Sequence, residues 1–356
     1  MNNYLLTAAA FAAAAVVYTA VGFVSSKKLC LRRAKVYSGK IKNTGVRILH
    51  ISDLHNCRFG ENQSELASLA NVTKPQMILL TGDIVEDTEE LKAGGKGTIL
   101  TPEHPARQLI ENITKIAPVY MVFGNHEANI RRREELKKEL RSLGVRLVGG
   151  KEEKISLGET DLLICGMDDP RCLDYLDENS PEVRFAELRE HKKSRDSFIS
   201  SLMRRIRDDR KRSGGRIDMW RKIQRETFSD IGEKKELTLL LSHRPEEQDF
   251  YNSLGFDIAF SGHAHGGQFR IPPFFNGLYA PHQGIFPKLA GGFYVVPKCR
   301  QNTKHEKRKV FRKNCGISIV SAFFHSVSRG LAVERFPRFY NPPEVSLITI
   351  TDCQNR

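Results

Sequence analysis

The amino-acid sequence predicts an α/β fold built on buried strands. Three observations predict it: short continuous apolar runs recur along the chain, amphipathic segments alternate with them, and the composition is that of an ordinary globular protein. In 356 residues, 40% belong to the hydrophobic class and 28% are charged. Short apolar runs that alternate with helices are typical of strands buried between α/β layers. At roughly 150 residues per domain, length alone suggests two domains.

The expected elements follow one another from residue 46 onward. Ten apolar runs are predicted to be strands: residues 46–51, 76–80, 119–123, 145–148, 161–166, 237–241, 257–260, 293–296, 316–320 and 345–351. Four amphipathic segments are predicted to be helices: residues 63–73, 105–116, 131–143 and 246–254. No internal repeat interrupts this frame, so the sequence predicts a single domain over residues 46–356.

The N-terminal segment is predicted to be a membrane anchor. Residues 3–25 carry no charge, and about 21 helical residues span roughly 30 Å, the thickness of a hydrocarbon core. Residues 26–45, expected to be a linker, are basic, and the positive-inside rule then places the rest of the chain on the cytoplasmic face of the inner membrane. A cleaved signal peptide is the alternative, although a basic n-region is missing and the apolar run is long.

Charge and cysteine content narrow the function further. Lys and Arg number 56 against 42 Asp and Glu, a net charge of +14, which favours a negative partner such as nucleic acid, anionic lipid or a phosphorylated substrate. Seven cysteines without a CxxC pair exclude a zinc ribbon and indicate a reducing compartment. Two stretches are expected insertions, residues 171–236, which contain the only Trp, and residues 298–313. Each would be either solvated surface or a face toward membrane or substrate.

Residue types that bind metals follow the predicted strands. Those after the first three strands are Asp53, His55, Asp83, Asn125 and His126, and those after two later strands are His243, His263 and His265. Ligands bind beyond the carboxyl ends of strands in open α/β sheets. Two residues spaced as D-x-H lie on the same side of an extended strand, and one carboxylate can bridge two ions. Without a thiolate, this set suits Mn, Fe, Zn or Co.

The ordered series DLH, GD, GNHE, SH and GHAHGGQ resembles the calcineurin-like, dinuclear metallophosphoesterase superfamily, from about residue 46 to residue 350. The resemblance implies two mixed β-sheets packed as a sandwich and flanked by helices. It implies one metal at Asp53, His55 and His265, a second metal at Asn125, His243 and His263, and Asp83 between them. His126 would be the catalytic histidine. Glu127 stands where the family commonly has Asp, and Ala264 replaces a frequent Thr.

A narrower resemblance comes from GGQ after GHAH, SRG at residues 328–330 and NPPE at residues 341–344. These resemble a membrane-associated bacterial branch of the superfamily, some of whose members hydrolyse the pyrophosphate of UDP-2,3-diacylglucosamine in lipid A biosynthesis, giving lipid X and UMP. The resemblance implies two divalent ions, with manganese favoured. Arg58 and Arg270 lie next to the motifs and would contact phosphate, or they are ordinary surface arginines.

Two other functions remain open at this point. A nuclease or general phosphodiesterase of the same superfamily would use the positive charge to bind a phosphate backbone, although nothing resembles an OB, KH or helix-turn-helix module. A non-catalytic binding module on the same fold would normally lack some of the ligands, whereas all seven are present here.

Overall fold

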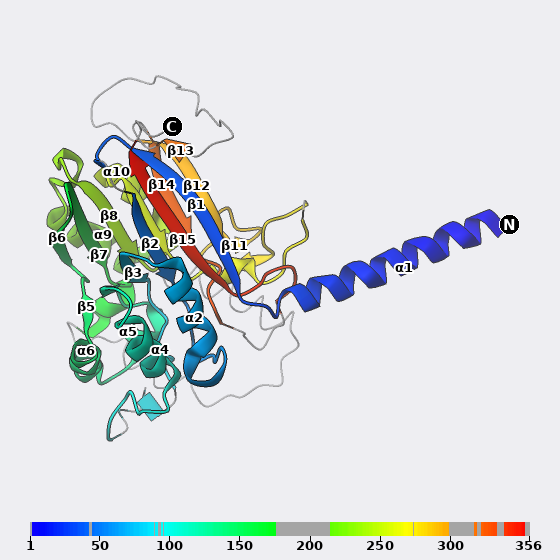
Figure 1. Cartoon of the computed structure of the whole chain (residues 1–356), viewed down its shortest axis with the longest axis horizontal. Coiled ribbons are helices and arrows are strands. Elements are labelled where there is room, and N and C mark those ends of the chain that lie inside the picture. The colour runs from blue at the N-terminus through cyan, green and yellow to red at the C-terminus, as the bar shows by residue number, and fades with distance from the viewer. Residues whose placement is uncertain are drawn as a thin grey trace.

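The computed structural model describes residues 2–42, 45–88, 90–91, 94, 96–175, 214–272, 274–298, 317–318, 322–332 and 338–352. Its centre consists of two β-sheets (Figure 1). In the first, the strands lie in the order β13 (Ile317–Ser318), β1 (Cys30–Ser38), β15 (Glu344–Asp352), β2 (Val46–Ile51), β3 (Met77–Leu80), β4 (Val119–Met121) and β5 (Val145–Leu147). Strands β15 and β2 pair antiparallel, and the other neighbours pair parallel.

The second sheet has the order β12 (Gly292–Pro297), β14 (Ala322–Val327), β9 (Ile258–Ser261), β8 (Leu237–Ser242), β7 (Thr160–Met167) and β6 (Lys151–Leu157). The two outer pairs are antiparallel, and the strands between them run parallel. A small hairpin joins β10 (Tyr279–Ala280) to β11 (Gly284–Ile285). Both large sheets are therefore mixed, as the family resemblance implies.

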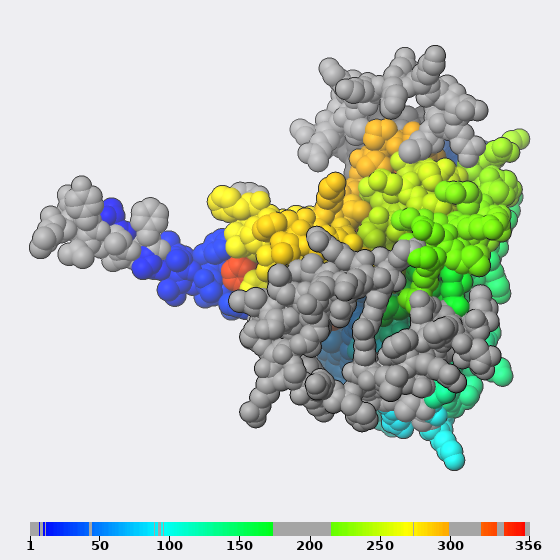
Figure 2. Space-filling view, turned by 180° about the vertical axis from the view of Figure 1, so that it is seen from behind, coloured from blue at the N-terminus to red at the C-terminus, as the bar shows by residue number. Residues whose placement is uncertain are grey.

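Helices complete the described chain. The α-helices are α1 (Asn2–Ser25), α2 (Ser64–Thr73), α4 (Pro105–Ile113), α5 (Asn125–Asn129), α6 (Arg133–Ser142), α9 (Gly214–Thr227) and α10 (Gln248–Leu254). Short 3-10 helices are η1 (Glu61–Gln63), η2 (Pro170–Tyr175), η3 (Ile231–Glu233), η4 (Pro245–Glu247) and η5 (His265–Gly267). Figures 1 and 2 show α1 leaving the body of the molecule on one side.

Side chains along each strand alternate between the two faces of the sheet, and this alternation separates the core into layers. In β3, Ile78 and Leu80 pack against the helical side with α2, α4 and α6, whereas Met77 and Leu79 face the second sheet. Side chains of both sheets meet in this middle core, and α9 and α10 cover the far face of the second sheet. Successive strand residues point to opposite faces, so a strand buried on both sides is mostly apolar. The predicted sandwich flanked by helices is confirmed.

The structure differs from the sequence analysis at several elements. Residues 26–45 were predicted to be a linker, but Cys30–Ser38 form β1, which pairs with β15 along its whole length. Basic residues interrupt its apolar pattern, and the strand was missed for that reason. Strands β6, β10, β11 and β14 and helix α5 were also not predicted, whereas α9 lies within residues 171–236, whose sequence has a helical pattern.

The two expected insertions are only partly described. In the first, residues 176–213 lie outside the described residues, but α9 carries Trp220 into the core that covers the second sheet. The indole Nε1 donates a hydrogen bond to the Asp168 carbonyl at 2.9 Å. One face of α9 therefore belongs to the core, while other side chains of the helix, such as Met219, are exposed. Residues 299–313 of the second insertion lie outside the described residues.

Helix α1 occupies the segment predicted to span a membrane. Within the described part of the chain, no helix combines the length and the apolar character needed to cross a bilayer. The predicted spanning anchor is thus not confirmed and stays a prediction.

Candidate metal centre

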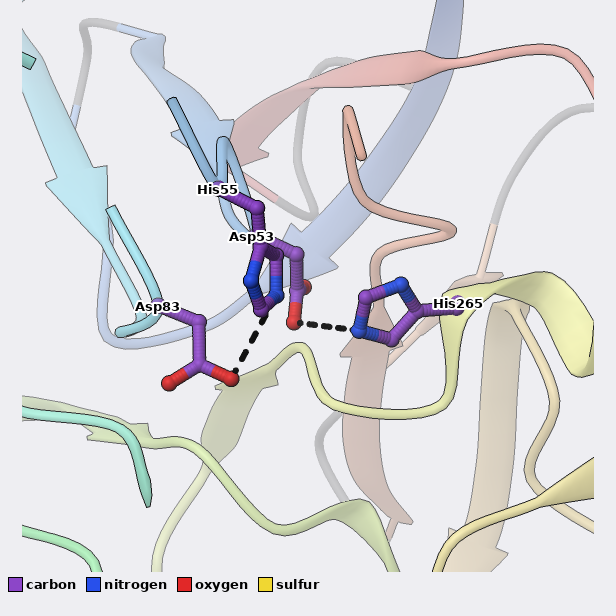
Figure 3. Close-up of side chains that lie close together, drawn as sticks. All are labelled: Asp53, His55, Asp83 and His265. Carbon is purple, nitrogen blue, oxygen red and sulfur yellow. Dashed lines mark ion pairs between the residues drawn. The ribbon is translucent and has the colours of Figure 1, made fainter. Parts of the chain in front are cut away.

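Four predicted ligands from both sheets converge at the carboxyl ends of the strands (Figure 3). Asp53 and His55 follow β2, Asp83 follows β3, and His265 follows β9. His55 Nε2 lies 3.5 Å from Asp83 Oδ2, and His265 Nε2 lies 3.4 Å from Asp53 Oδ1. These four side chains therefore form one possible metal-binding group.

A second group shares Asp83 with the first. It consists of Asp83, His243 and His263. His243 Nε2 lies 3.1 Å from Asp83 Oδ2 and 3.1 Å from the amide oxygen of Asn125. His263 Nδ1 is 3.1 Å from the same His243 nitrogen. Because Asp83 belongs to both groups, the two positions are adjacent and one carboxylate faces both.

The chemistry of this cluster fits a bound cation. His55 Nε2 and His263 Nε2 are buried and have no hydrogen-bond partner, although a buried polar atom without a partner is costly. Burial raises the pKa of Asp53, and the nearby Asp83 carboxylate raises it further. A divalent ion would accept the nitrogen lone pairs and neutralise both carboxylates. The His and Asp cluster could therefore bind metal.

Hydrogen bonds outside the cluster orient its imidazoles. His243 Nδ1 lies 2.7 Å from the Thr81 carbonyl oxygen, and His55 Nδ1 pairs with the Glu86 carboxylate. Each contact leaves the Nε2 of the ring directed toward Asp83. Such partners fix the tautomer and the ring orientation of a metal-binding histidine.

The ligand loops share an unusual backbone conformation. Five predicted ligands have a positive φ between 46° and 66°: Asp53, His55, Asp83, His263 and His265. This left-handed region is uncommon for residues other than glycine and costs of order 1–3 kcal/mol per residue. Neighbouring glycines make room for the tight turns: a Cβ on Gly82, whose φ is 89°, would collide with the backbone of Gly124.

His126 lies beside the cluster at the start of α5. Its backbone N–H donates to Asp83 Oδ1 at 2.8 Å, and its Nε2 is 3.9 Å from Asp83 Oδ2. Its Nδ1 is 2.6 Å from Asp87 Oδ1. Burial alone would lower the pKa of His126, but Asp83 and Asp87 raise it to about 10. A quarter of the side chain is exposed, so the imidazole borders both the cluster and the surface.

Two carboxylates at the site have roles that the sequence analysis missed. Asp87 is buried, and it holds His126 Nδ1 through one oxygen and the Asn129 amide through the other. Glu127 does not contact the His126 ring in the described hydrogen bonds; its carboxylate accepts backbone N–H groups of the Asp83 loop instead. Asp87 therefore orients His126, and Glu127 shapes the loop that carries Asp83.

The two arginines predicted to contact phosphate lie in different surroundings. Arg58 is exposed and donates to the Glu103 carbonyl at 2.7 Å and to Gln108 at 3.0 Å, and neither belongs to the cluster. Arg270 is buried, and it donates to the Gly266 carbonyl at 3.4 Å and to Asn276. Burial lowers the pKa of Arg270 to about 9, and the neighbouring arginines Arg329 and Arg32 act in the same direction. No described hydrogen bond joins either arginine to a cluster side chain.

The two mixed sheets and the His and Asp cluster are the features expected of a metallophosphoesterase, and comparison with known proteins shows the family. The family model for calcineurin-like phosphoesterases matches residues 46–267. The chain belongs to this family, whose members hydrolyse phosphoester or pyrophosphate bonds. The match ends at η5, so it includes every strand end that contributes to the cluster.

Individual relatives are more distant. UDP-2,3-diacylglucosamine pyrophosphatase LpxG of Chlamydia muridarum is 29% identical over 113 residues, which are 31% of this chain and 28% of the relative. Among solved structures, the NAD nucleotidase NadN of Haemophilus influenzae is 14% identical, with a TM-score of 0.42 over 81% of this chain and 51% of that one. The phosphopantetheinyl hydrolase PptH of Mycobacterium tuberculosis is 16% identical, with a TM-score of 0.34 over 61% and 82%. No conclusion rests on TM-scores this low.

Proposed function

We propose that the chain is a two-metal phosphoesterase that hydrolyses UDP-2,3-diacylglucosamine to UMP and 2,3-diacylglucosamine 1-phosphate. The position of Asp83 is the observation that supports the binding of two metal ions. Its Oδ2 lies 3.5 Å from His55 Nε2 and 3.1 Å from His243 Nε2, so it is close to a histidine of each group. Asp53, His55 and His265 would hold one ion, and Asn125, His243 and His263 the other, with Asp83 shared. Manganese is the favoured ion among those that suit these donors.

The residues around the ions would have separate roles in hydrolysis. A metal pair bound at these residues would lower the pKa of a water molecule and offset negative charge on the phosphoryl oxygens. Because Asp87 holds Nδ1 of His126, the Nε2 of the ring is free to carry a proton toward the leaving oxygen. The hydrogen bond to the Asp87 carboxylate raises the pKa of His126 and so favours the protonated ring. His126 is thus the proposed general acid.

The substrate is supported by the relative LpxG and by the chemistry of the chain. A pyrophosphate is anionic, and the chain carries a net charge of +14. The proposed substrate, UDP-2,3-diacylglucosamine, also has two acyl chains, and these favour an enzyme that is held at a membrane. We propose that α1 provides the attachment and that the catalytic domain faces the cytoplasm. The exposed valines of α1 and the exposed Lys27 and Lys28 that follow it support this placement.

Substrate identity is tested with the full chain purified in detergent and loaded with Mn. UMP release from UDP-2,3-diacylglucosamine is measured beside hydrolysis of an aryl phosphodiester and of an oligonucleotide. We expect UMP release to exceed both other activities by at least tenfold in kcat/KM. Faster cleavage of the oligonucleotide would instead establish the nuclease alternative, and hydrolysis of none would establish a binding module.

The proposed general acid is tested in the same assay. Replacing His126 by Ala should leave two metal ions per chain and reduce turnover by roughly a hundredfold or more, the scale of a lost acid group. Metal content is measured by mass spectrometry of the dialysed protein. Loss of an ion in this variant would contradict the assignment, because His126 would then be a ligand.

Membrane attachment is tested separately from activity. Membranes from cells that produce the full chain are washed with high salt and then with alkaline carbonate. Retention through the salt wash supports attachment through α1, and retention through carbonate supports the spanning anchor predicted from the sequence. Recovery of the protein in the soluble fraction before any wash would contradict both.

A further inference from the structure

The loop between η5 and β12 exposes large apolar side chains. Phe274 is 83% exposed, Phe286 61% and Ile285 48%. Among the described residues, all but two of the exposed large apolar side chains lie on this loop or on α1. Contiguous exposed apolar surface on a soluble domain usually marks an interaction site.

The loop and α1 are joined into one fixed surface. Tyr18 of α1 donates its hydroxyl to the Pro272 carbonyl at 3.4 Å, and the Tyr340 hydroxyl donates to the Tyr18 carbonyl at 2.9 Å. The Phe339 ring packs directly on Gly22, where a Cβ would collide with it. Figures 1 and 2 show the loop, in yellow, beside the C-terminal end of the helix.

Ring contacts stabilise both ends of this surface. Phe275 meets Phe286 edge to face with ring centroids 5.4 Å apart, which holds the two limbs of the loop together. Phe339 stacks on Phe269 at 5.7 Å and meets Phe23 of α1 at 5.1 Å. The exposed phenylalanines are therefore presented by a braced loop, and their exposure is a property of the folded chain.

Positive charge surrounds the apolar surface. Lys27, Lys28 and Lys288 are exposed at its margin. At the base of the loop, Arg32 and Arg329 share the single carboxylate of Glu344, at 3.5 and 3.2 Å. Arg270 beside them has hydrogen bonds to Gly266 and Asn276 but no carboxylate partner in the described contacts. The three exposed lysines favour an anionic surface.

We propose that the C-terminal half of α1 and the loop of residues 268–291 form a docking surface for an anionic lipid bilayer. Apolar and aromatic side chains with a basic margin are the composition of interfacial membrane-binding elements. This inference deepens the proposed function, because it rests on the attachment of α1 to a membrane. The loop of residues 268–291 adds a second contact with the bilayer, beside that of α1, and the two contacts together fix the orientation of the catalytic domain.

Docking would also set the position of the metal centre. The same loop carries His282, whose ring stacks on His263 with centroids 5.3 Å apart and planes 16° apart. The loop thus reaches from its exposed phenylalanines to a predicted metal ligand. A substrate whose acyl chains stay in the bilayer would then meet the cluster without leaving the lipid.

The test uses tryptophan fluorescence in vesicles of phosphatidylethanolamine and phosphatidylglycerol, prepared with or without lipids brominated on the acyl chains. Trp220 is the only native Trp and is buried. The full-length variant Phe286→Trp adds an indole on the loop. The control Met219→Trp adds one at an exposed position of α9. This helix lies on the opposite side of the molecule from α1 (Figure 1).

We expect brominated lipid to quench at least half of the added fluorescence of Phe286→Trp and almost none of that of Met219→Trp. Equal emission of Phe286→Trp in both kinds of vesicle, with the protein bound to them, would overturn the docking surface and leave the attachment of α1 intact. Protein that stays in the supernatant would overturn both. Hydrolysis of a soluble aryl phosphodiester by both variants reports that the metal centre is unaffected.

Discussion

Replacing Glu127 by Gln should destabilise the fold and disturb the metal centre together. The carboxylate is fully buried and accepts four backbone N–H groups. Oε2 accepts from Asp83 at 2.8 Å and from Gly124 at 2.9 Å. Oε1 accepts from Ile84 at 2.7 Å and from Val85 at 2.9 Å. These bonds hold the turn in which Asp83 has its positive φ.

The expected loss follows from the donors left without an acceptor. Gln retains one oxygen, and its NH2 group must face the other two backbone N–H groups. A buried unsatisfied donor costs about 1–3 kcal/mol, so two of them should lower the free energy of unfolding by about 2–6 kcal/mol. Asp83 moves with its turn, so we also expect the affinity for both metal ions to fall by about 10–100-fold, the range for the loss of an orienting partner.

Urea unfolding of the metal-free protein measures the first effect, and metal titration measures the second. Glu139→Gln is the matched control, because Glu139 also accepts backbone N–H groups, from Ile99 at 3.0 Å and Leu100 at 2.8 Å, outside the metal centre. The Glu139→Gln substitution leaves one donor unsatisfied at a half-buried position. It should therefore lower the free energy of unfolding by about 1 kcal/mol and leave metal affinity unchanged. A Glu127→Gln variant as stable as this control, with full metal affinity, would refute the reasoning.

Three further predictions test other parts of the structure. Replacing Asp83 by Ala should remove both metal ions together, because its carboxylate belongs to both groups; elemental analysis that finds one ion per chain would contradict a shared ligand. Replacing Asp87 by Asn should lower turnover by about 10–100-fold with two ions retained, because His126 Nδ1 loses its charged acceptor; unchanged turnover would refute the orienting role. Burial lowers the pKa of His325 to about 3, so the unfolded chain, with its usual pKa near 6.5, binds the proton that the folded chain excludes. Folding stability should therefore fall below pH 6.5, by about 1.4 kcal/mol per pH unit for this group, and the unfolding free energy of His325→Gln, measured in urea, should depend less on pH by that amount.

The cluster residues could be predicted from the sequence because they follow strands that are mostly apolar. The strand predicted at residues 46–51 has the same bounds in the structure. Asp53 and His55 follow it directly, and parallel neighbours bring Asp83 to the same edge. A polar residue at the end of a doubly buried strand stands out against its surroundings, and the sheet determines where it lies.

Asp87 and Glu127 could not be assigned in the same way. Asp87 belongs to an acidic stretch in which nothing distinguishes it, and its partner His126 is 39 residues away. Glu127 binds backbone groups, which every sequence has at every position, so no residue type marks its partners. Strand β14 was missed because its buried His325 and Ser326, which have hydrogen-bond partners in other elements, resemble polar surface residues in the sequence.

Two carboxylates of the cluster accept backbone N–H groups from other turns at the site. Asp53, after β2 of the first sheet, accepts the backbone N–H of His263, after β9 of the second, at 3.0 Å. Asp83 accepts the backbone N–H of His126 at 2.8 Å. These bonds thus offset part of the cost of the positive φ of Asp53, Asp83 and His263. The bond from the His263 backbone to Asp53 also joins a loop of the second sheet directly to a loop of the first, so the two sheets together set the spacing of these side chains.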